Sequence, residues 1–236
     1  MNKSLLVLLA AAFSAQTFAA SEPTPVPSST IRITEVAPWG SGNSSVADDW
    51  FELTNTGTSA VNISGWKMDD NSYASGSAVA LAGISSIAAG ESVIFIETSG
   101  THTAAGNAAA FKTLWFGAKA PAGLQIGSYS GSGVGLSTSG DAVTIFDASG
   151  DVQAVVAFGN SPAGPSYPTF DNAAGQNGGT IAALSAAGTH GAFVAANDSL
   201  EIGSPGTIAA VPEPETYAML LAGLGLMGFM ARRRRA

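Results

Sequence analysis

Short apolar segments separated by turns constrain this sequence more than any other feature. In the clearest pair, residues 142–146 and 152–158 flank an Asp/Ser/Gly-rich turn at 147–150. Runs of β-branched and aromatic residues on either side of such a turn are typical of a β-hairpin. Comparable segments occur at 31–36, 50–54, 61–68 and 93–96. About six short strands with turns between them predict an all-β chain, an antiparallel sandwich of two sheets.

The rest of the body carries weaker patterns. Residues 98–130 are rich in Ala and Gly, and we expect a long loop between central strands there. Residues 160–202 are loosely patterned, and they are expected to supply a returning edge strand and the final strand. Outside the two ends of the chain, no window has the periodicity of an amphipathic helix. The sequence therefore predicts no helix in the body.

Composition narrows the class of protein. Charged residues make up 11% of the chain, where about 25% is usual, and hydrophobic residues make up 46%. This combination is typical of an extracellular β-protein and excludes a disordered chain. There are no cysteines, so the fold depends on its core and not on disulfides.

The body is acidic. Between residues 21 and 210 there are 15 acidic and 4 basic residues, a net charge of −11. Such a surface repels nucleic acid and anionic lipid, so no nucleic-acid partner is expected. Divalent cations and cationic polymers are better candidate partners.

The N-terminus has the layout of a secretory signal peptide. Lys3 precedes an apolar run at 5–13 that is too short to span a bilayer, and small residues follow up to Ala19. We expect a signal peptide at 1–19 and a Pro/Ser linker at 20–29. The protein is therefore expected to be exported.

The C-terminus predicts a membrane anchor. Residues 217–231 carry no charge and are followed by four arginines. A basic cluster holds its end of a membrane helix on the cytoplasmic side, which places the body outside. We expect a transmembrane helix here. Before it, the prolines of a Val-Pro-Glu-Pro motif keep the chain extended, as a processing enzyme requires.

This ending resembles the PEP-CTERM sorting domain, which combines a Pro-Glu-Pro motif, an apolar helix and a terminal arginine cluster in that order. The residues that match are Val211, Pro212, Glu213, Pro214, Arg232, Arg233, Arg234 and Arg235. The resemblance implies an exosortase and the export machinery of a Gram-negative bacterium as partners. It implies a transient inner-membrane anchor, then release or attachment at the cell surface, in association with exopolysaccharide and biofilm.

The body resembles the lamin-tail domain, an immunoglobulin-like antiparallel β-sandwich. The most specific pieces are WFELTNTG at 50–57 and SGW at 64–66, and the resemblance runs from about 30 to 207. It implies a binding or adhesion module and not a catalyst. The long segment 98–130 departs from the family pattern. The expected organisation is a signal peptide (1–19), a linker (20–29), a β-sandwich (30–207), a short linker (208–210) and a sorting segment (211–236).

Catalytic chemistry has little support in the sequence. Only His102 and His190 could act as bases near neutral pH, and each lies in a Gly/Thr/Ala loop. There is no G-x-S-x-G motif and no zinc-ligand spacing, so we expect no catalytic residues and no cofactor. Acids cluster around two strands, and Asp48, Asp49, Asp69 and Asp70 are candidate calcium ligands. Turn formation explains the same residues without a metal.

The remaining candidates are aromatic and acidic. Trp50 and Trp66 are expected in the core, whereas Trp39 and Trp115 are expected in loops as exposed contacts, for example with sugars. Glu35 and Glu52 lie in apolar strands and are expected to alternate outward.

The leading hypothesis is an exported, non-enzymatic surface or matrix protein. The alternatives are a calcium-assisted secreted hydrolase and a structural subunit of a surface array.

Overall fold

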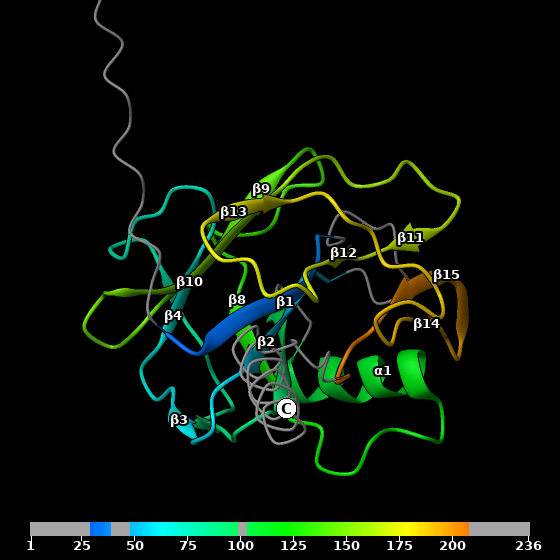
Figure 1. Cartoon of the computed structure of the whole chain (residues 1–236), viewed down its shortest axis with the longest axis horizontal. Coiled ribbons are helices and arrows are strands. Elements are labelled where there is room, and N and C mark those ends of the chain that lie inside the picture. Colours follow the sequence, from blue (N-terminus) through cyan, green and yellow to red (C-terminus); the bar gives the residue numbers. More distant parts are fainter. Residues whose placement is uncertain (1–28, 39–47, 99–102, 208–236) are drawn as a thin grey trace, which may run out of the picture.

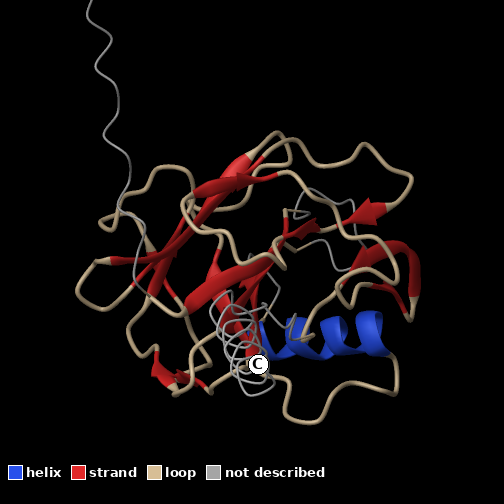
Figure 2. Ribbon diagram, viewed as in Figure 1, coloured by secondary structure: helices blue, strands red, loops and turns tan. Residues whose placement is uncertain are grey.

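Two five-stranded sheets pack face to face in the computed structural model, which describes residues 29–38, 48–98 and 103–207 (Figures 1 and 2). The first sheet has the order β12 (Phe170–Asp171), β1 (Ile31–Ala37), β2 (Trp50–Asn55), β7 (Ser92–Thr98) and β8 (Ile126–Ser130). The second has the order β13 (Gly179–Ile181), β10 (Val152–Phe158), β9 (Asp141–Phe146), β4 (Lys67–Asp69) and β5 (Val79–Ala80). The two packed sheets confirm the predicted β-sandwich.

Smaller elements complete the described fold. A three-stranded sheet has the order β11 (Tyr167–Pro168), β15 (Asp198–Gly203) and β14 (Phe193–Ala195), and β3 (Val61–Asn62) pairs with β6 (Ser86–Ile87). One helix, α1 (Ala104–Phe116), lies beside the first sheet (Figure 1). Among the described residues, no helix is long and apolar enough to cross a membrane. The expected signal peptide and transmembrane helix lie outside the described residues.

The core between the sheets comes from the inward faces of both. Phe51 of the first sheet stacks on Phe95 and contacts Tyr129, and Met68 and Ile145 approach from the second sheet. Trp66 joins this core, as predicted. The 142–158 hairpin is also confirmed, because β9 and β10 pair antiparallel around a turn in which the Asp147 carboxylate accepts backbone N–H groups from Ser149 and Asp151.

Helix α1 corrects the prediction of a long loop at 98–130. Thr103 caps its N-terminus by accepting from the Gly106 N–H, and one face buries Asn107, Phe111, Leu114 and Trp115. These positions have the spacing of one helix face. The sequence signal was hidden because the first half of the helix is mostly alanine.

The helix also explains why the sandwich is not purely antiparallel. Strands β7 and β8 pair in parallel, and a parallel pair needs a long crossover between its strands. Residues 103–125 form the described part of that crossover and contain α1. Two further pairs are parallel, β10 with β13 and β11 with β15, and β11, β13 and β15 come from the loosely patterned region after residue 160.

Trp115 was predicted to be exposed, and that prediction was wrong. Its side chain is 1% exposed and packs in a second apolar cluster on the outer face of the first sheet. Its ring makes edge contacts with Trp50 and Phe193 at centroid distances of 5.7 and 5.8 Å. Trp50 is 2% exposed in the same cluster, so the prediction that it is a core residue is confirmed.

We expect Trp115→Ala to lower the free energy of unfolding by about 3–5 kcal/mol, because it leaves a large cavity between α1 and the sheet. Urea denaturation followed by circular dichroism measures this change. Val194→Ala, at a site that is 43% exposed, is the control and should change stability by less than about 0.5 kcal/mol. A Trp115→Ala loss as small as that of the control would contradict the assignment of this cluster as core.

Candidate functional site

Two buried glutamates face each other across the central strands of the first sheet. Glu35 of β1 pairs in register with Glu52 of β2, and their side chains are 0% and 1% exposed. The β-strand register shifts between Ile33 and Glu35, so Thr34 is an extra residue in β1. This bulge turns Glu35 to the outer face of the sheet, where Glu52 also lies. Instead of facing solvent, both carboxyls lie on a face that the rest of the chain covers.

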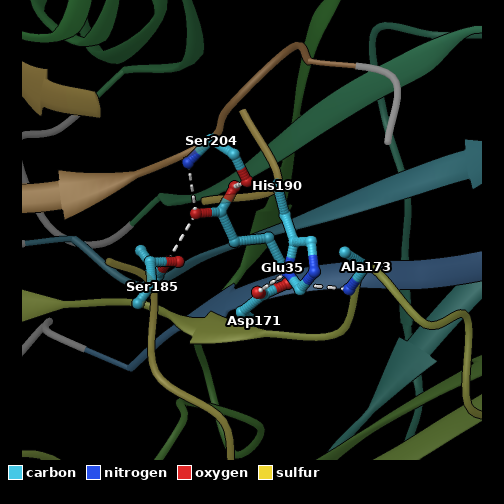
Figure 3. Close-up of polar contacts among 7 residues, drawn as sticks. Glu35, Asp171, Ala173, Ser185, His190 and Ser204 are labelled. Atoms are coloured by element: carbon cyan, nitrogen blue, oxygen red, sulfur yellow. Dashed lines mark hydrogen bonds and ion pairs between the residues drawn. The ribbon is translucent and has the colours of Figure 1, made fainter. Parts of the chain in front are cut away.

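Glu35 accepts hydrogen bonds from two segments that are distant in the sequence, one containing Thr169 and one containing Ser204 (Figure 3). Its Oε1 accepts from the Thr169 hydroxyl at 2.5 Å and from the Ser204 N–H at 2.8 Å. The Thr169 hydroxyl also lies 2.6 Å from that of Ser185, which extends the network. Gly203 must be glycine here, because a Cβ would lie 2.5 Å from Glu35 Oε1 and 2.8 Å from the Trp115 ring.

Glu52 holds the same end of the chain. Its Oε2 accepts from the Gly206 N–H at 2.7 Å, and its Oε1 accepts from the Thr34 hydroxyl at 2.6 Å. The two glutamates therefore fix residues 203–207, which we call the closing segment, to the outer face of the first sheet. The closing segment is the last part of the chain that the structure describes.

Burial sets the protonation of the pair. Burial first, and then the neighbouring Glu52, raises the pKa of Glu35 to about 8. Burial raises the pKa of Glu52 to about 7, against the lowering effect of its hydrogen bonds from Thr34 and Gly206. A carboxyl with a raised pKa near neutral pH is often catalytic, but neither of these reaches solvent. Their contacts make them a structural clamp on the closing segment.

A second polar pair lies at the sheet edge. His190 Nδ1 lies 2.7 Å from Asp171 Oδ2, and Asp171 Oδ1 accepts from the Ala173 N–H at 2.7 Å (Figure 3). A carboxylate that orients a histidine is one part of a nucleophilic site. Among residues 29–38, 48–98 and 103–207, however, no hydroxyl is hydrogen-bonded to the His190 ring. The other candidate base, His102, lies outside the described residues.

The acids predicted as calcium ligands do gather at one end of the sandwich, where they support loops. Asp69 is fully buried, and its Oδ2 accepts from the Ser72 hydroxyl at 2.6 Å and from the Ala74 N–H at 2.7 Å. Asp70 Oδ1 accepts from the Ser72 N–H at 2.8 Å. These are the turn contacts that the sequence offered as the explanation without a metal.

The other pair of predicted ligands, Asp48 and Asp49, lies against a different loop. Asp48 and Asp49 are both 2% exposed, and Asp49 Oδ2 accepts from the Leu136 N–H at 2.7 Å. Asp141 joins the two loops, because its oxygens accept from the N–H groups of Asn71 and Ser137 at 3.1 and 2.8 Å. In the described part of the chain, no group of three or more His, Cys, Asp or Glu is arranged to hold a metal ion. Calcium binding by these acids stays a prediction.

Several predicted sites fall where the structure gives no description. Trp39 and all residues of the sorting motif, 211–214 and 232–235, lie outside the described residues. The clamp was missed by sequence reasoning, because nothing in the sequence links Glu35 and Glu52 to a segment more than a hundred residues away. The local hint was an acidic residue among the apolar residues of each strand.

We expect the free energy of unfolding to fall as the pH rises from about 5 to 8, by on the order of 6 kcal/mol, because a difference of one pKa unit between the folded and the unfolded chain is worth about 1.4 kcal/mol. Both carboxyls have a higher pKa in the folded chain than in the unfolded chain, where it is near 4.5. The stability they contribute is therefore complete below about pH 4.5, and it is lost as they ionise. Denaturation midpoints across this pH range measure the slope.

Glu35→Gln should reduce that slope, because the amide oxygen still accepts the Thr169 and Ser204 hydrogen bonds but does not ionise. Asp151→Asn, at an exposed turn position, is the matched control and should keep the slope. Stability that rises over this range, or a Glu35→Gln slope equal to that of the control, would contradict the protonation assigned to the clamp.

Comparison with known families agrees with this architecture. The Lamin Tail Domain model matches residues 24–160, which is more than half of the chain, and the PEP-CTERM protein-sorting motif matches residues 210–235. No curated protein matches the chain. Residues 161–207, beyond the first match, supply β11 to β15 and the closing segment. The chain belongs to the Lamin Tail Domain family and carries a C-terminal PEP-CTERM sorting motif.

Proposed function

We propose that this protein is a non-enzymatic component of the bacterial cell surface, whose lamin-tail domain binds a polymer of the extracellular matrix. The observation that carries the proposal is the joining of the two matched regions in one chain. A PEP-CTERM motif marks an exported protein for sorting by an exosortase. The domain attached to it is then the part that acts outside the cell.

The clamp supports the assignment of sorting to the C-terminal motif and of binding to the folded domain. The closing segment is fixed to the sheet up to Gly206, and the sorting motif begins at residue 210. A processing enzyme that acts on the motif meets a folded domain just before it. Removal of the tail takes away none of the described strands, so the domain stays folded after processing. We infer that the membrane anchor is transient and that the mature domain reaches the cell surface or the medium.

Binding is favoured over catalysis by the use of the polar groups. The buried glutamates hold the closing segment, and Asp49 and Asp69 hold loops. Each of these carboxylates therefore serves the fold. Exopolysaccharide is the matrix polymer that we favour as partner, because the acidic body disfavours nucleic acid and other polyanions.

We expect Glu213→Ala to leave the C-terminal tail on the protein and to keep it in the inner membrane, because the motif that the exosortase recognises is broken. The intact mass of the protein from membranes and from the medium measures this. Glu215→Ala is the matched control, since it removes an acid two residues along, and it should be processed as usual.

Deletion of the exosortase should have the same effect as Glu213→Ala. The proposed sorting route is wrong if the tail is lost from Glu213→Ala or from the deletion strain as completely as from the unaltered protein.

A further inference from the structure

A small hollow lies on the outer face of the second sheet, whereas the clamp lies on the outer face of the first. Neither Asp48 nor Asp49 lines it. It has a volume of about 170 Å³. The residues that line it are Tyr73, Val155, Ala157, Gly178, Gly179 and Thr180. The hollow lies between the loop that follows β4 and the parallel pair of β10 and β13. Neither the clamp nor the sorting motif explains it.

The loop that follows β4 is folded back over this outer face. Val143 and Ile145 point into the core, so Thr144 between them points outward, and yet Thr144 is fully buried. Its hydroxyl donates to the Asp70 carbonyl at 3.2 Å, which places the start of the loop on the sheet. Tyr73, three residues further along, forms one wall of the hollow.

Tyr73 has an unusual backbone and an exposed ring. Its φ is +54°, in the left-handed region where a bulky residue is rare, and its side chain is 50% exposed. Glycine or asparagine would adopt this conformation with less strain. Strained backbone of this kind gathers at binding sites, where the surrounding structure enforces it.

The enforcement comes from buried Asp69. Its carboxylate accepts from the residues on both sides of Tyr73, namely the Ser72 hydroxyl and the Ala74 N–H, and also from the Ser77 hydroxyl at 3.2 Å. The loop is therefore fixed before any ligand arrives. A rigid aromatic side chain that is presented in advance loses little entropy on binding.

The opposite wall is polar and lacks bulky side chains. Gly178 and Gly179 leave the main chain uncovered where edge strand β13 begins, and Thr180 adds an exposed side chain with a hydroxyl. The side-chain Oδ1 of Asn177, the residue before Gly178, accepts from the Val155 N–H at 2.8 Å.

These features specify the chemistry of a ligand. An aromatic ring offers its face to C–H groups, and the facing wall offers hydroxyl and main-chain groups for hydrogen bonds. A sugar ring has an apolar C–H face and a rim of hydroxyls, and the hollow has room for about one such ring. None of the residues that line the hollow is charged, which suits an uncharged sugar, and the net charge of −11 on the body disfavours an anionic one.

We propose that Tyr73 and the Gly178–Thr180 edge of β13 form a binding site for one ring of a neutral polysaccharide. This inference rests on the proposed function, since it names the matrix polymer class and the place where the domain holds it.

The test uses the mature protein purified from the cell surface and the exopolysaccharide of the producing cells, separated by anion exchange into neutral and anionic fractions. Each fraction is immobilised, and the affinity of the protein is measured. Tyr73→Gly removes the ring and relieves the positive φ, so it should fold, and we expect it to weaken binding to the neutral fraction about tenfold or more. Tyr73→Phe keeps the ring and should change affinity less than about threefold.

Leu200→Ala is the control for loss of an exposed apolar side chain outside the hollow, and its affinity should be unchanged. If Tyr73→Gly binds the neutral fraction as tightly as the unaltered protein does, the site is wrong while the proposed function stands. Binding confined to the anionic fraction overturns the inferred ligand chemistry. No binding to either fraction overturns both this inference and the proposed role with exopolysaccharide.

Discussion

The pairing of β1 with β2 through a bulge at Thr34 is the constraint on which the rest of the described fold depends. The extra residue lets Ile33 and Val36 both face the core, and it turns Glu35 to the opposite face beside Glu52. Two carboxyls cannot be buried there without donors, because the loss of hydration is costly. The Thr169 hydroxyl and the N–H groups of Ser204 and Gly206 supply those donors. Residues from both ends of the domain are thereby tied to one pair of strands.

The outer face of the first sheet is therefore buried, and it forms a second core. Helix α1, the three-stranded sheet and the closing segment lie over the face that carries Trp50 and Glu52, and the apolar part of this core is the cluster around Trp115. In a simple sandwich that face would meet water, and its residues would be polar. Here the chain after β7 and the chain after residue 160 cover it. The outer face of the second sheet, by contrast, stays available for a ligand at Tyr73.

Sequence reasoning found the strands that have strong local signals. The 142–158 hairpin, the alternation of β2 and the burial of Trp50 and Trp66 are all confirmed, because each follows from local periodicity. It failed for α1, where the alanine-rich first half gave no periodic signal, and therefore for Trp115. It failed for Glu35 and Glu52, because alternation says which face a residue occupies but not what covers that face. Loop-bound Tyr73 carried no sequence signal at all.

By itself, the sequence determined the class of the body, its acidic character and the sorting motif at its end. These properties reside in composition, in short periodic runs and in a contiguous motif, so no contact between distant residues is needed to read them. Only the tertiary structure decided that two glutamates clamp the closing segment, that Trp115 is a core residue, and that Asp69 holds Tyr73 beside β13. Each of these depends on segments far apart in the chain, or on a bulge or a strained turn, and local patterns carry no information about such contacts.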